Sequence, residues 1–383
     1  MDFAALEQAY EFDVYPKRDV TIVRGKNALV WDDQGNEYID CIVGHGVANL
    51  GHAHPVIVDA IQRQAEKLTC LSNVFYNDQR ALLLEQLVKI SPEGLTRAFL
   101  CNSGTESIEA AIKFARFTTG RTDFVCAMRS FHGRSCGALS ATFKADYRKP
   151  FEPLLPGFHF APYNNFEKFE AQVTDQTAAI LLEPIQGEGG VNFGDAEFFR
   201  QIRQLCDQRD ILLIIDEVQS GFCRTGMMFG CDHFDVSPDI MCVAKAIAGG
   251  LPMGAVVCSD KVTIPKGKHG TTCGGNPLCS AAARAAIATM LEDDLCRQAQ
   301  EKGDYLAKRL AAHTLTKVRT VRHRGLMFGI ELKQKVVPTI RALLERGLLV
   351  FPAGATVIRV YPPLTIEYEV LDRVADRLVE ALA

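Results

Sequence analysis

The chain has 383 residues, of which 48% are hydrophobic and 23% charged, as is typical of a globular protein with a sizeable core. Its formal net charge is −4 at pH 7, and the charges are scattered rather than collected in blocks, which argues against a nucleic-acid partner. No run approaches the ~18 apolar residues of a membrane-spanning helix, and the acidic first residues lack the pattern of a secretion signal. We therefore expect a cytoplasmic protein with no membrane partner.

The thirteen cysteines favour reduced, buried thiols over a disulfide framework. No CxxC pair occurs, and several cysteines lie inside apolar runs, namely Cys101, Cys126, Cys242 and Cys258. His52 and His54 could suggest metal ligands, but no second group of ligands stands at a matching spacing. We predict no metal site.

The first structured part of the chain, residues 20–39, alternates between apolar and polar residues. Gly25, Asn27 and the segment DDQGN interrupt this alternation, as turns do. The pattern predicts a β-hairpin or a β-meander.

The next informative segment, RAFLCNSGTESIEAAIKFAR, predicts a short strand, a turn and a helix. The strand breaks at Asn102, Ser103 and Gly104, and the helix then presents one apolar face. Ser103 and Glu106 fit a capping box. A helix amino terminus reached through a glycine turn can hold a phosphate, although an ordinary capped helix has the same pattern. A nicotinamide Rossmann loop is excluded because no GxGxxG occurs.

Apolar runs at residues 124–128, 179–182, 211–215 and 240–244 predict buried strands. The run 211–215 is too short for a helix and too uniformly apolar for a half-exposed strand, so it indicates a parallel sheet buried on both faces. Asp216 and Lys245 stand where two of these runs end. Ligands bind at the carboxyl ends of the strands in open α/β sheets, so we expect both side chains at one edge.

A carboxylate beside an amine suits pyridoxal phosphate, which a lysine binds covalently while an aspartate partners its pyridinium nitrogen. Asp216 as a helix cap and Lys245 as a surface charge are the ordinary alternatives. The surrounding sequence, DEVQSGFCRTG and then a lysine followed by AIAGGLPMGAV, strongly resembles the class III, fold type I aminotransferases. Earlier segments (YPKR, RGKNALVWDDQGNEYID, GVANLGHAHP and SNVFYNDQ) resemble the acetylornithine aminotransferases and the related carrier-protein aminotransferases of lysine synthesis.

This resemblance implies an α/β fold of the pyridoxal phosphate transferase type. A large domain with a mostly parallel seven-stranded sheet is expected, together with a small α+β domain built from both chain ends. We place the boundaries at residues 1–46 for the amino-terminal part of the small domain, 47–276 for the large domain and 277–383 for the rest. A long helix after Pro277, broken near Glu292, should connect the two domains.

The resemblance also assigns the cofactor contacts. The NSGTE segment matches the family's phosphate loop, so Ser103, Gly104 and Thr105 should hold the phosphate. The other expected contacts are an aromatic stack from Phe131, an apolar contact from Val218 on the opposite ring face, a hydrogen bond from Gln219 to the ring oxygen, and the bonds from Asp216 and Lys245 described above.

The same resemblance assigns the substrate contacts. In the motif FHGR, Arg134 should bind the substrate carboxylate through its planar fork. Glu188 should pair with an arginine near the carboxyl terminus, which we identify as Arg322. His323 stands where the family usually has glycine, so Arg324 remains an alternative for this role.

A further segment, HGTTCGGNP, resembles a loop that reaches into the neighbouring subunit's site. Thr272 should contact the partner's phosphate, and Thr271 should lie near its substrate. Cys273 replaces the aromatic residue common at that position. The resemblance therefore implies a homodimer with shared active sites.

We predict an aminotransferase that moves the terminal amino group of an acylated diamino acid, N-acetylornithine above all, to 2-oxoglutarate, in arginine or lysine biosynthesis. Alternatives with the same fold are transaminases of ornithine, 4-aminobutyrate or a carrier-bound lysine or ornithine precursor, and an aminomutase. A regulatory module that binds the cofactor without turnover is the alternative of a different class.

Overall fold

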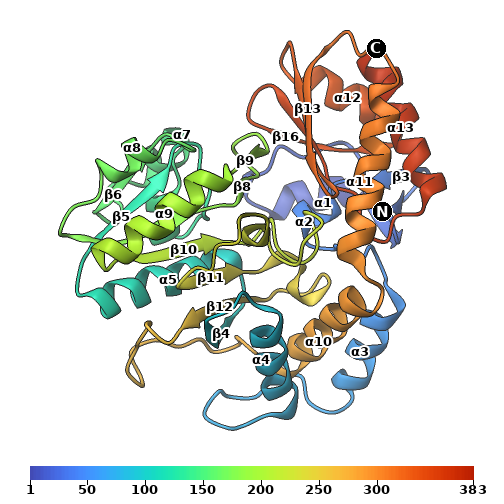
Figure 1. The fold of residues 1–383 in the computed structure, drawn as a ribbon. Helices are drawn as coiled ribbons and strands as arrows, with labels where there is room; N and C mark the ends of the chain where they lie inside the picture. Colours follow the sequence, from blue (N-terminus) through green and yellow to red (C-terminus); the bar gives the residue numbers. More distant parts are fainter.

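A seven-stranded sheet forms the centre of the larger of two units in the computed structural model, which describes residues 1–383 (Figure 1). Its strands, in spatial order, are β4 (Leu95–Cys101), β12 (Gly254–Ser259), β11 (Ile240–Val243), β10 (Leu212–Asp216), β7 (Thr177–Leu182), β5 (Asp123–Ala127) and β6 (Phe158–Ala161). Only β12 is antiparallel to its neighbours. The predicted, mostly parallel seven-stranded sheet is therefore confirmed.

Helices cover both faces of this sheet, which explains the uninterrupted apolar runs of its strands. Successive residues of β10 point to opposite faces. Leu213 and Ile215 belong to the apolar cluster that contains α9 (Ala196–Arg209), whereas Ile214 belongs to the cluster that contains α5 (Gly104–Thr119). All five residues of β10 are buried, so the end of the strand is held rigidly where Asp216 stands.

The remaining helices of the large unit surround the sheet and its edges. They are α3 (Pro55–Ala65), α4 (Asp78–Ile90), α6 (Cys136–Ala141), α7 (Ala145–Arg148), α8 (Phe166–Glu170) and α10 (Pro277–Glu292), with short 3-10 turns at Lys149–Phe151, Gly230–Phe234 and Lys245–Ala248. A small hairpin, β8 (Ile185–Gln186) and β9 (Asn192–Phe193), follows β7. No helix of the structure has the length and apolar character needed to cross a bilayer.

The smaller unit combines the two ends of the chain. Its first sheet contains the predicted meander β1 (Ile22–Lys26), β2 (Leu29–Asp32) and β3 (Glu37–Asp40), and β15 (Leu348–Leu349) joins it parallel to β3. Its second sheet has the order β13 (Val318–Arg324), β14 (Met327–Leu332), β17 (Val357–Val360) and β16 (Phe351–Ala353). The helices α1 (Phe3–Tyr10), α2 (Val43–Gly46), α11 (Leu295–Ala311), α12 (Val337–Glu345) and α13 (Tyr368–Leu382) complete the chain.

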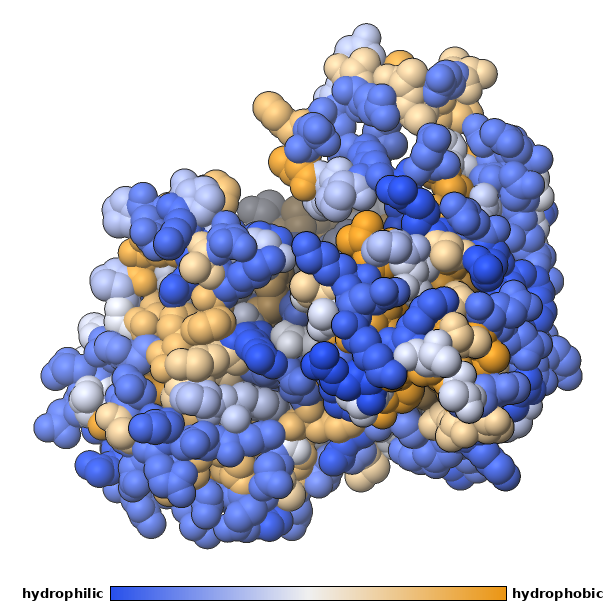
Figure 2. Space-filling view, turned by 90° about the horizontal axis from the view of Figure 1, so that it is seen from above, coloured by the Kyte–Doolittle hydropathy of each residue, from blue (hydrophilic) through white to orange (hydrophobic).

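The connection between the units is a broken helix, as predicted. The helix α10 ends at Glu292 and α11 begins at Leu295, because Asp294 adopts a left-handed conformation with φ of 49°. Seen from above, the surface is hollowed between the two units (Figure 2). The domain bounds at residues 46 and 276 stay a prediction.

Candidate active site

Asp216 and Lys245 lie at the ends of neighbouring parallel strands and face the same cavity. Asp216 ends β10 opposite Cys242 of β11, and Lys245 follows three residues later at the start of a 3-10 turn. The cavity has a volume of about 170 Å³. Its lining consists of Gly104, Thr105, Phe131, His132, Gly133, Glu183, Ile185, Glu188, Asp216, Val218, Gln219 and Lys245. Eight residues that the sequence assigned to the site are thus brought together.

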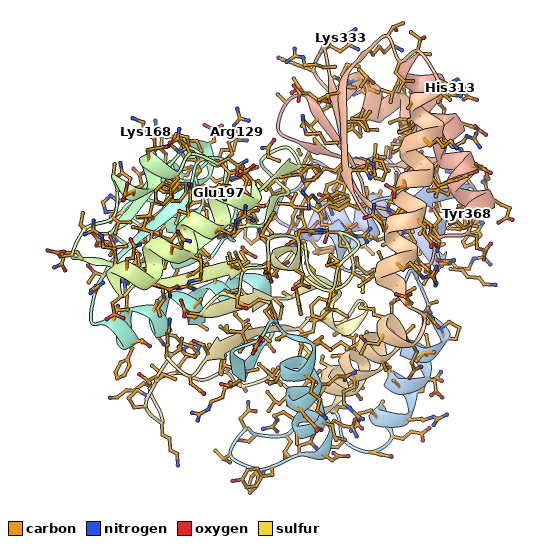
Figure 3. All side chains as sticks on the ribbon, in the orientation of Figure 1. Arg129, Lys168, Glu197, His313, Lys333 and Tyr368 are labelled. Atoms are coloured by element: carbon orange, nitrogen blue, oxygen red, sulfur yellow. The ribbon has the colours of Figure 1, made fainter.

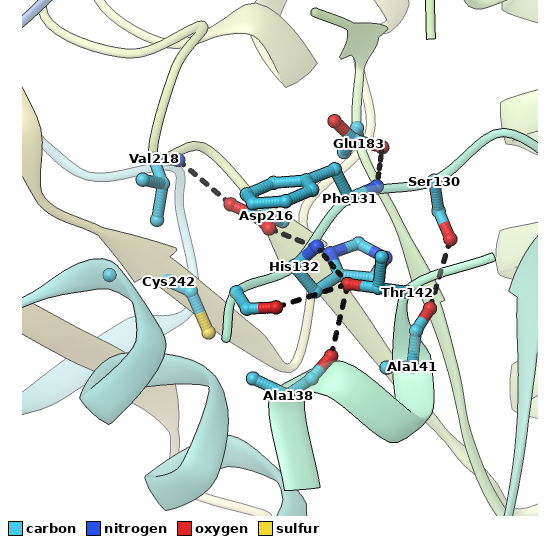
Figure 4. A network of polar contacts seen from close by, with 12 residues as sticks. Ser130, Phe131, His132, Ala138, Ala141, Thr142, Glu183, Asp216, Val218 and Cys242 are labelled. Carbon is cyan, nitrogen blue, oxygen red and sulfur yellow. Dashed lines mark hydrogen bonds and ion pairs between the residues drawn. The ribbon is translucent and has the colours of Figure 1, made fainter. Parts of the chain in front are cut away.

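Two donors hold the carboxylate of Asp216 in place (Figure 4). The imidazole Nδ1 of His132 donates to Asp216 Oδ2 over 2.7 Å, and the Val218 N–H donates to Oδ1 over 3.0 Å. The backbone N–H of His132 donates to Thr142 Oγ1 at 2.9 Å, which fixes the backbone from which the imidazole extends. Sequence reasoning regarded His132 only as a structural hydrogen-bonding residue, and the structure shows that its partner is the central aspartate.

The buried position of Lys245 favours its neutral amine. Burial lowers the pKa of Lys245, and the nearby charges of Asp216 and Glu188 only partly offset this effect. The pKa of Glu183 shifts in the other direction. Burial, and then the charge of Asp216, raise the pKa of its carboxyl well above the usual value, which also favours the neutral form. An amine that loses its proton readily can act both as a nucleophile and as a general base.

The amino terminus of α5 forms the other side of the cavity. Ser103 Oγ accepts a hydrogen bond from the Glu106 N–H at 3.2 Å, as the predicted cap requires. The reciprocal bond differs from a capping box, because Glu106 Oε2 accepts from the Asn102 N–H at 2.9 Å rather than from Ser103. The hydroxyl of Ser103 is thus used within the turn, and Ser103 does not line the cavity.

Two glycines bring the backbone close to this helix terminus. A Cβ atom on Gly104 would lie 2.8 Å from Val218 Cγ1, and one on Gly133 would lie 2.5 Å from Thr105 Oγ1. Gly133 also has a φ of 141°, a conformation that L side chains rarely adopt. The space at the positive end of α5 therefore depends on both glycines, and it suits an anion such as a phosphate.

These residues together fit pyridoxal phosphate. The helix terminus of α5 and Thr105 offer donors for the phosphate, Phe131 and Val218 offer apolar surfaces for the ring, and Asp216 offers an acceptor for a ring N–H. Lys245 adds an amine to the same lining. The individual contacts stay predictions.

The predicted ion pair between Glu188 and Arg322 is wrong. Arg322 Nη1 instead lies 2.6 Å from Glu331 Oε2, and its Nη2 donates to the Gly190 carbonyl at 2.8 Å. Arg322 stands opposite Gly329 on β14, so Glu331, two residues further along, lies on the same face of the sheet and within reach. This local partner holds the guanidinium on β13.

Neither Arg324 nor His323 takes this role. The Arg324 guanidinium lies over the rings of Phe193 and Phe234, at 5.4 and 5.9 Å from their centroids. His323 stacks on Phe328 with an interplanar angle of 10°.

The partner of Glu188 is Arg359 on β17, which sequence reasoning missed. Arg359 Nη1 lies 2.5 Å from Glu188 Oε1 and 3.4 Å from Gln219 Oε1. Burial alone would raise the pKa of Glu188, but the charge and hydrogen bond of Arg359 outweigh burial, and the net pKa is lowered. An arginine inside the apolar run TVIRVYPP was the signal that could have found it, since buried arginines are rarely without a partner.

An outer pocket continues from this cavity toward solvent and has a volume of about 490 Å³. It shares Phe131 and Glu188 with the inner cavity. Its wall includes the basic residues Arg129, Lys144 and Arg322. Both units contribute residues to this pocket, and Arg129 lies on the large unit at the side toward the small unit (Figure 3).

Arg134 is exposed and lies beside the site rather than within the cavity lining. Its guanidinium carbon is 3.8 Å from the ring centroid of Tyr147 and 5.5 Å from that of Phe131. Tyr147 in turn packs edge-on against Phe131. The arginine is thus held near the mouth by aromatic surfaces, with its donors available to a ligand.

The two threonines of the segment HGTTCGGNP do not line the cavity of their own chain. Thr271 Oγ1 accepts a hydrogen bond from Asn102 Nδ2 at 3.0 Å, and Thr272 is exposed. Cys273 is exposed beside them. This arrangement leaves Thr272 free for a contact outside its own protomer.

Known proteins resemble this chain over nearly its whole length. The family described as aminotransferase class-III matches residues 13–382. The chain is 49% identical to a [LysW]-aminoadipate semialdehyde transaminase of Deinococcus radiodurans, over 97% of this chain and 87% of that protein. It is 45% identical to an acetylornithine aminotransferase of Methanopyrus kandleri, over 100% of this chain and 99% of that protein.

Solved structures show the same likeness. The ornithine aminotransferase from Toxoplasma gondii superimposes with a TM-score of 0.95 at 32% identity, covering 100% of this chain and 94% of that one. The N-acetylornithine aminotransferase from Stenotrophomonas maltophilia superimposes with a TM-score of 0.85 at 35% identity, covering 98% and 97%.

Proposed function

Because the chain belongs to the class-III aminotransferases, we propose that it moves the terminal amino group of an acylated diamino acid, N-acetylornithine above all, to 2-oxoglutarate. The chain is a pyridoxal phosphate-dependent enzyme, as this family is. The observation that carries the choice of substrates is the ion pair between Glu188, which lines the cavity, and the buried Arg359 behind it. Arg359 would be a second cation for the additional carboxylate of glutamate. Glu188 would cover that cation while the acylated diamino acid is bound.

Pyridoxal phosphate supplies an electron-withdrawing ring that makes a C–H bond of the bound amine acidic. Asp216, held by His132 and the Val218 N–H, would accept the N–H of the ring and so keep the ring nitrogen protonated. Lys245 would hold the cofactor through its Nζ, and the same amine, when free, is placed to act as the general acid and base. The lowered pKa of Lys245 favours the neutral amine that this proton transfer needs.

The remaining assigned residues orient the cofactor. Gly104, Thr105 and the Ser103 turn would hold the phosphate at the amino terminus of α5, and Phe131 and Val218 would provide apolar surfaces for the ring. Gln219 accepts a hydrogen bond from the Tyr361 hydroxyl at 3.0 Å, so its amide N–H₂ is free to donate to the ring oxygen.

The donor and acceptor differ in their carboxylates. An acylated diamino acid has one carboxylate, far from the amine that reacts, and Arg134 at the mouth of the site is placed to bind it. Glutamate, formed from 2-oxoglutarate, carries an additional carboxylate next to its amine. That carboxylate takes Arg359 after Glu188 turns away, whereas Glu188 neutralises Arg359 while the acylated donor is bound. Arg322 contributes to the outer pocket, where its pair with Glu331 leaves it a secondary charge for the substrate.

A carrier-bound donor is the second candidate, because the outer pocket favours it. This pocket of about 490 Å³ is larger than an acetyl group requires, and its basic residues suit an acidic group attached to the donor's α-nitrogen. The similarity to the [LysW]-aminoadipate semialdehyde transaminase points in the same direction. Ornithine and 4-aminobutyrate, which lack an acyl group, would leave this space unused.

We further propose a homodimer with shared sites in the cytoplasm. The exposed Thr272 supports sharing, since it has no role within its own protomer, and it would contact the phosphate of the partner's cofactor while Thr271 lies near the partner's substrate. Thirteen unpaired cysteines, most of them buried, suit a compartment that keeps thiols reduced.

A spectroscopic titration of the cofactor-loaded protein tests the proposal. N-acetylornithine, ornithine, 4-aminobutyrate and an α-N-γ-glutamyl-lysine, which imitates a carrier's end, are added one at a time, and the rate of the absorbance change is recorded. We expect the two acylated amines to react at least tenfold faster than the free ones. Faster reaction of ornithine would overturn the proposed donor, and preference for the glutamyl compound would select the carrier-bound candidate.

A further inference from the structure

Two cysteines that are 73 positions apart in the sequence meet behind the active site. The distance between Cys223 Sγ and Cys296 Sγ is 2.8 Å. Non-bonded heavy atoms normally pack at roughly 3.5–4 Å, and a disulfide bond is about 2.05 Å long. The two sulfur atoms therefore lie closer than ordinary packing would bring them, and a movement of less than ~1 Å would join them.

The position of Cys223 connects this pair to the two units of the fold. Cys223 lies four residues after Gln219, in a segment that docks against the small unit, where the Leu326 N–H donates to the Arg224 carbonyl at 3.1 Å. Cys296 is the second residue of α11, the helix that leads from the large to the small unit.

The backbone around Cys223 is fixed. Phe222 and Cys223 both have left-handed φ values, 58° and 65°, which residues other than glycine adopt only where their surroundings impose them. Both side chains are buried. The sulfur of Cys223 is thus held pointing at α11.

The two thiols differ in their access to solvent. Cys296 is partly exposed, whereas Cys223 is buried. The hydrogen bond from Cys296, and then burial, raise the pKa of Cys223 far above the usual value. An oxidant from solvent therefore reaches Cys296 first, and Cys223 is placed to react second.

We propose that Cys223 and Cys296 form a dithiol site that a low-molecular-weight disulfide, such as glutathione disulfide, oxidises reversibly to an intramolecular disulfide. The Cys296 thiolate attacks one sulfur of the oxidant, whose S–S bond breaks and releases one thiol. Cys223 then loses its proton and attacks Cys296 Sγ, which forms the protein disulfide and releases the second thiol. The two cysteines lose two electrons and two protons, and the oxidant becomes two thiols.

The new bond would tie the segment that carries Val218 and Gln219 to the first turn of α11. Because the sulfur atoms already touch, the cross-link holds the present arrangement of the two units and needs no dismantling of the site. It also closes a long loop, which restricts the unfolded chain and raises the melting temperature. The inference does not depend on which amine the enzyme uses.

The test uses the full-length, cofactor-loaded protein, incubated with glutathione disulfide, digested without reduction and analysed by mass spectrometry. We expect a cross-linked pair of peptides containing Cys223 and Cys296, and a melting temperature several degrees higher that dithiothreitol restores to its starting value. Cys70, Cys136 and Cys273 are exposed and serve as internal acceptors, on which only single glutathione adducts should appear.

Two matched variants separate the steps. Cys223→Ser should retain glutathione on Cys296, because nothing displaces it, whereas Cys296→Ser should leave Cys223 unmodified in its buried position. Neither oxidised variant should show the rise in melting temperature. If the wild-type protein instead carries a lasting glutathione adduct on Cys296, or neither residue reacts while the exposed cysteines do, the proposal is overturned. The wild-type peptide map decides this even if a variant folds poorly.

Discussion

Arg359 and Glu188 form an ion pair in which a buried, doubly anchored cation meets a partly exposed carboxylate. Arg359 Nε and Nη2 donate to the Pro352 carbonyl at 3.2 and 3.0 Å, and the guanidinium lies 3.9 Å from the ring centroid of Phe351. The side chain of Glu188 is 31% exposed, against 2% for that of Arg359. An exchange of partners therefore requires less rearrangement at Glu188 than at Arg359.

We predict that Arg359→Ala slows the half-reaction with glutamate far more than the half-reaction with the acylated donor. Truncating one member of a desolvated charge pair typically costs ~2–5 kcal/mol. The partial exposure of Glu188 places the effect near ~2 kcal/mol, which corresponds to a loss of roughly 30-fold in rate. Single-turnover absorbance measurements of each half-reaction would show the difference.

Arg322→Ala is the matched control, since Arg322 pairs with Glu331 rather than with Glu188. It should affect both half-reactions to a similar, small extent. Equal impairment of both halves by Arg359→Ala would contradict the exchange of partners. A selective glutamate defect in Arg322→Ala would return the role to the arginine that the sequence first suggested.

The sequence predicted the elements of the site whose position follows from local pattern. Asp216 and Lys245 stand at the ends of apolar runs. The carboxyl end of a buried strand can be located from the local sequence alone, without knowing how the strands pack. The capped turn before α5 could be found in the same way. The bounds of these strands differ from the predicted ones by at most two residues.

The partner of Glu188 could not be found in this way. Its identity depends on which face of the second small-unit sheet points at the cavity, and that is decided by the pairing of β13, β14 and β17. Arg322 and Arg359 lie on different strands of this sheet, separated by β14, and only the latter points at Glu188. Likeness to a family motif placed an arginine near the carboxyl terminus, but the choice between them needed the three-dimensional register.

We predict that Lys245→Ala abolishes turnover, because no other lysine lines the cavity. Borohydride reduction of the wild-type protein, followed by peptide mapping, should find the cofactor attached to Lys245 alone. Lys144, in the outer pocket, is the nearest alternative, and Lys144→Ala should keep the cofactor attached. Label on any other lysine would refute the assignment.

The hydrogen bond from His132 should matter for the rate rather than for substrate affinity. His132→Phe removes one donor from the buried carboxylate of Asp216, and a hydrogen bond to a charged group is worth ~1.5–3 kcal/mol. We expect kcat to fall roughly 10- to 100-fold, with KM for both substrates little changed.

A second histidine–aspartate pair provides the control for this test. His159 lies 3.2 Å from Asp123 at the surface, with its side chain 42% exposed. His159→Phe should leave kcat unchanged. A decrease in kcat of the same size in both variants would indicate general loss of structure and would count against a specific role of His132.

Glu217 should make stability depend on pH. It is fully buried, and burial raises the pKa of its carboxyl to about 7, although bonds from Ser220, Gly230 and Cys231 partly oppose this rise. Between pH 4.5 and 7 the folded state therefore holds a proton that the unfolded chain releases. This contribution to stability is complete below pH 4.5 and is lost as the pH rises to 7, a change of about 3 kcal/mol.

Glu217→Gln removes the titrating group at nearly constant size. Urea unfolding of both proteins at several pH values between 4.5 and 8 would test the prediction. The difference in unfolding free energy between wild type and variant should move in favour of the variant as the pH rises. A difference that stays constant over this range would show that Glu217 does not titrate there.

The last prediction concerns the sharing of active sites between two protomers. Thr272 is exposed and absent from the lining of its own chain's cavity, while Lys245 and Asp216 lie within that lining. If Thr272 binds the phosphate of the partner's cofactor, then Lys245→Ala and Thr272→Glu are complementary, the second because its carboxylate repels the phosphate. Each variant alone should be nearly inactive.

Subunit exchange between the two variants should restore activity. Random pairing makes half of the dimers mixed, and each mixed dimer contains one site with both defects and one with neither, so about a quarter of the wild-type activity should return. Lys245→Ala mixed with Asp216→Ala is the control, because these residues belong to the same cavity and every site then keeps at least one defect. Recovery in the first mixture but not in the second would show that Thr272 acts across the dimer, whereas no recovery after verified exchange would place it elsewhere.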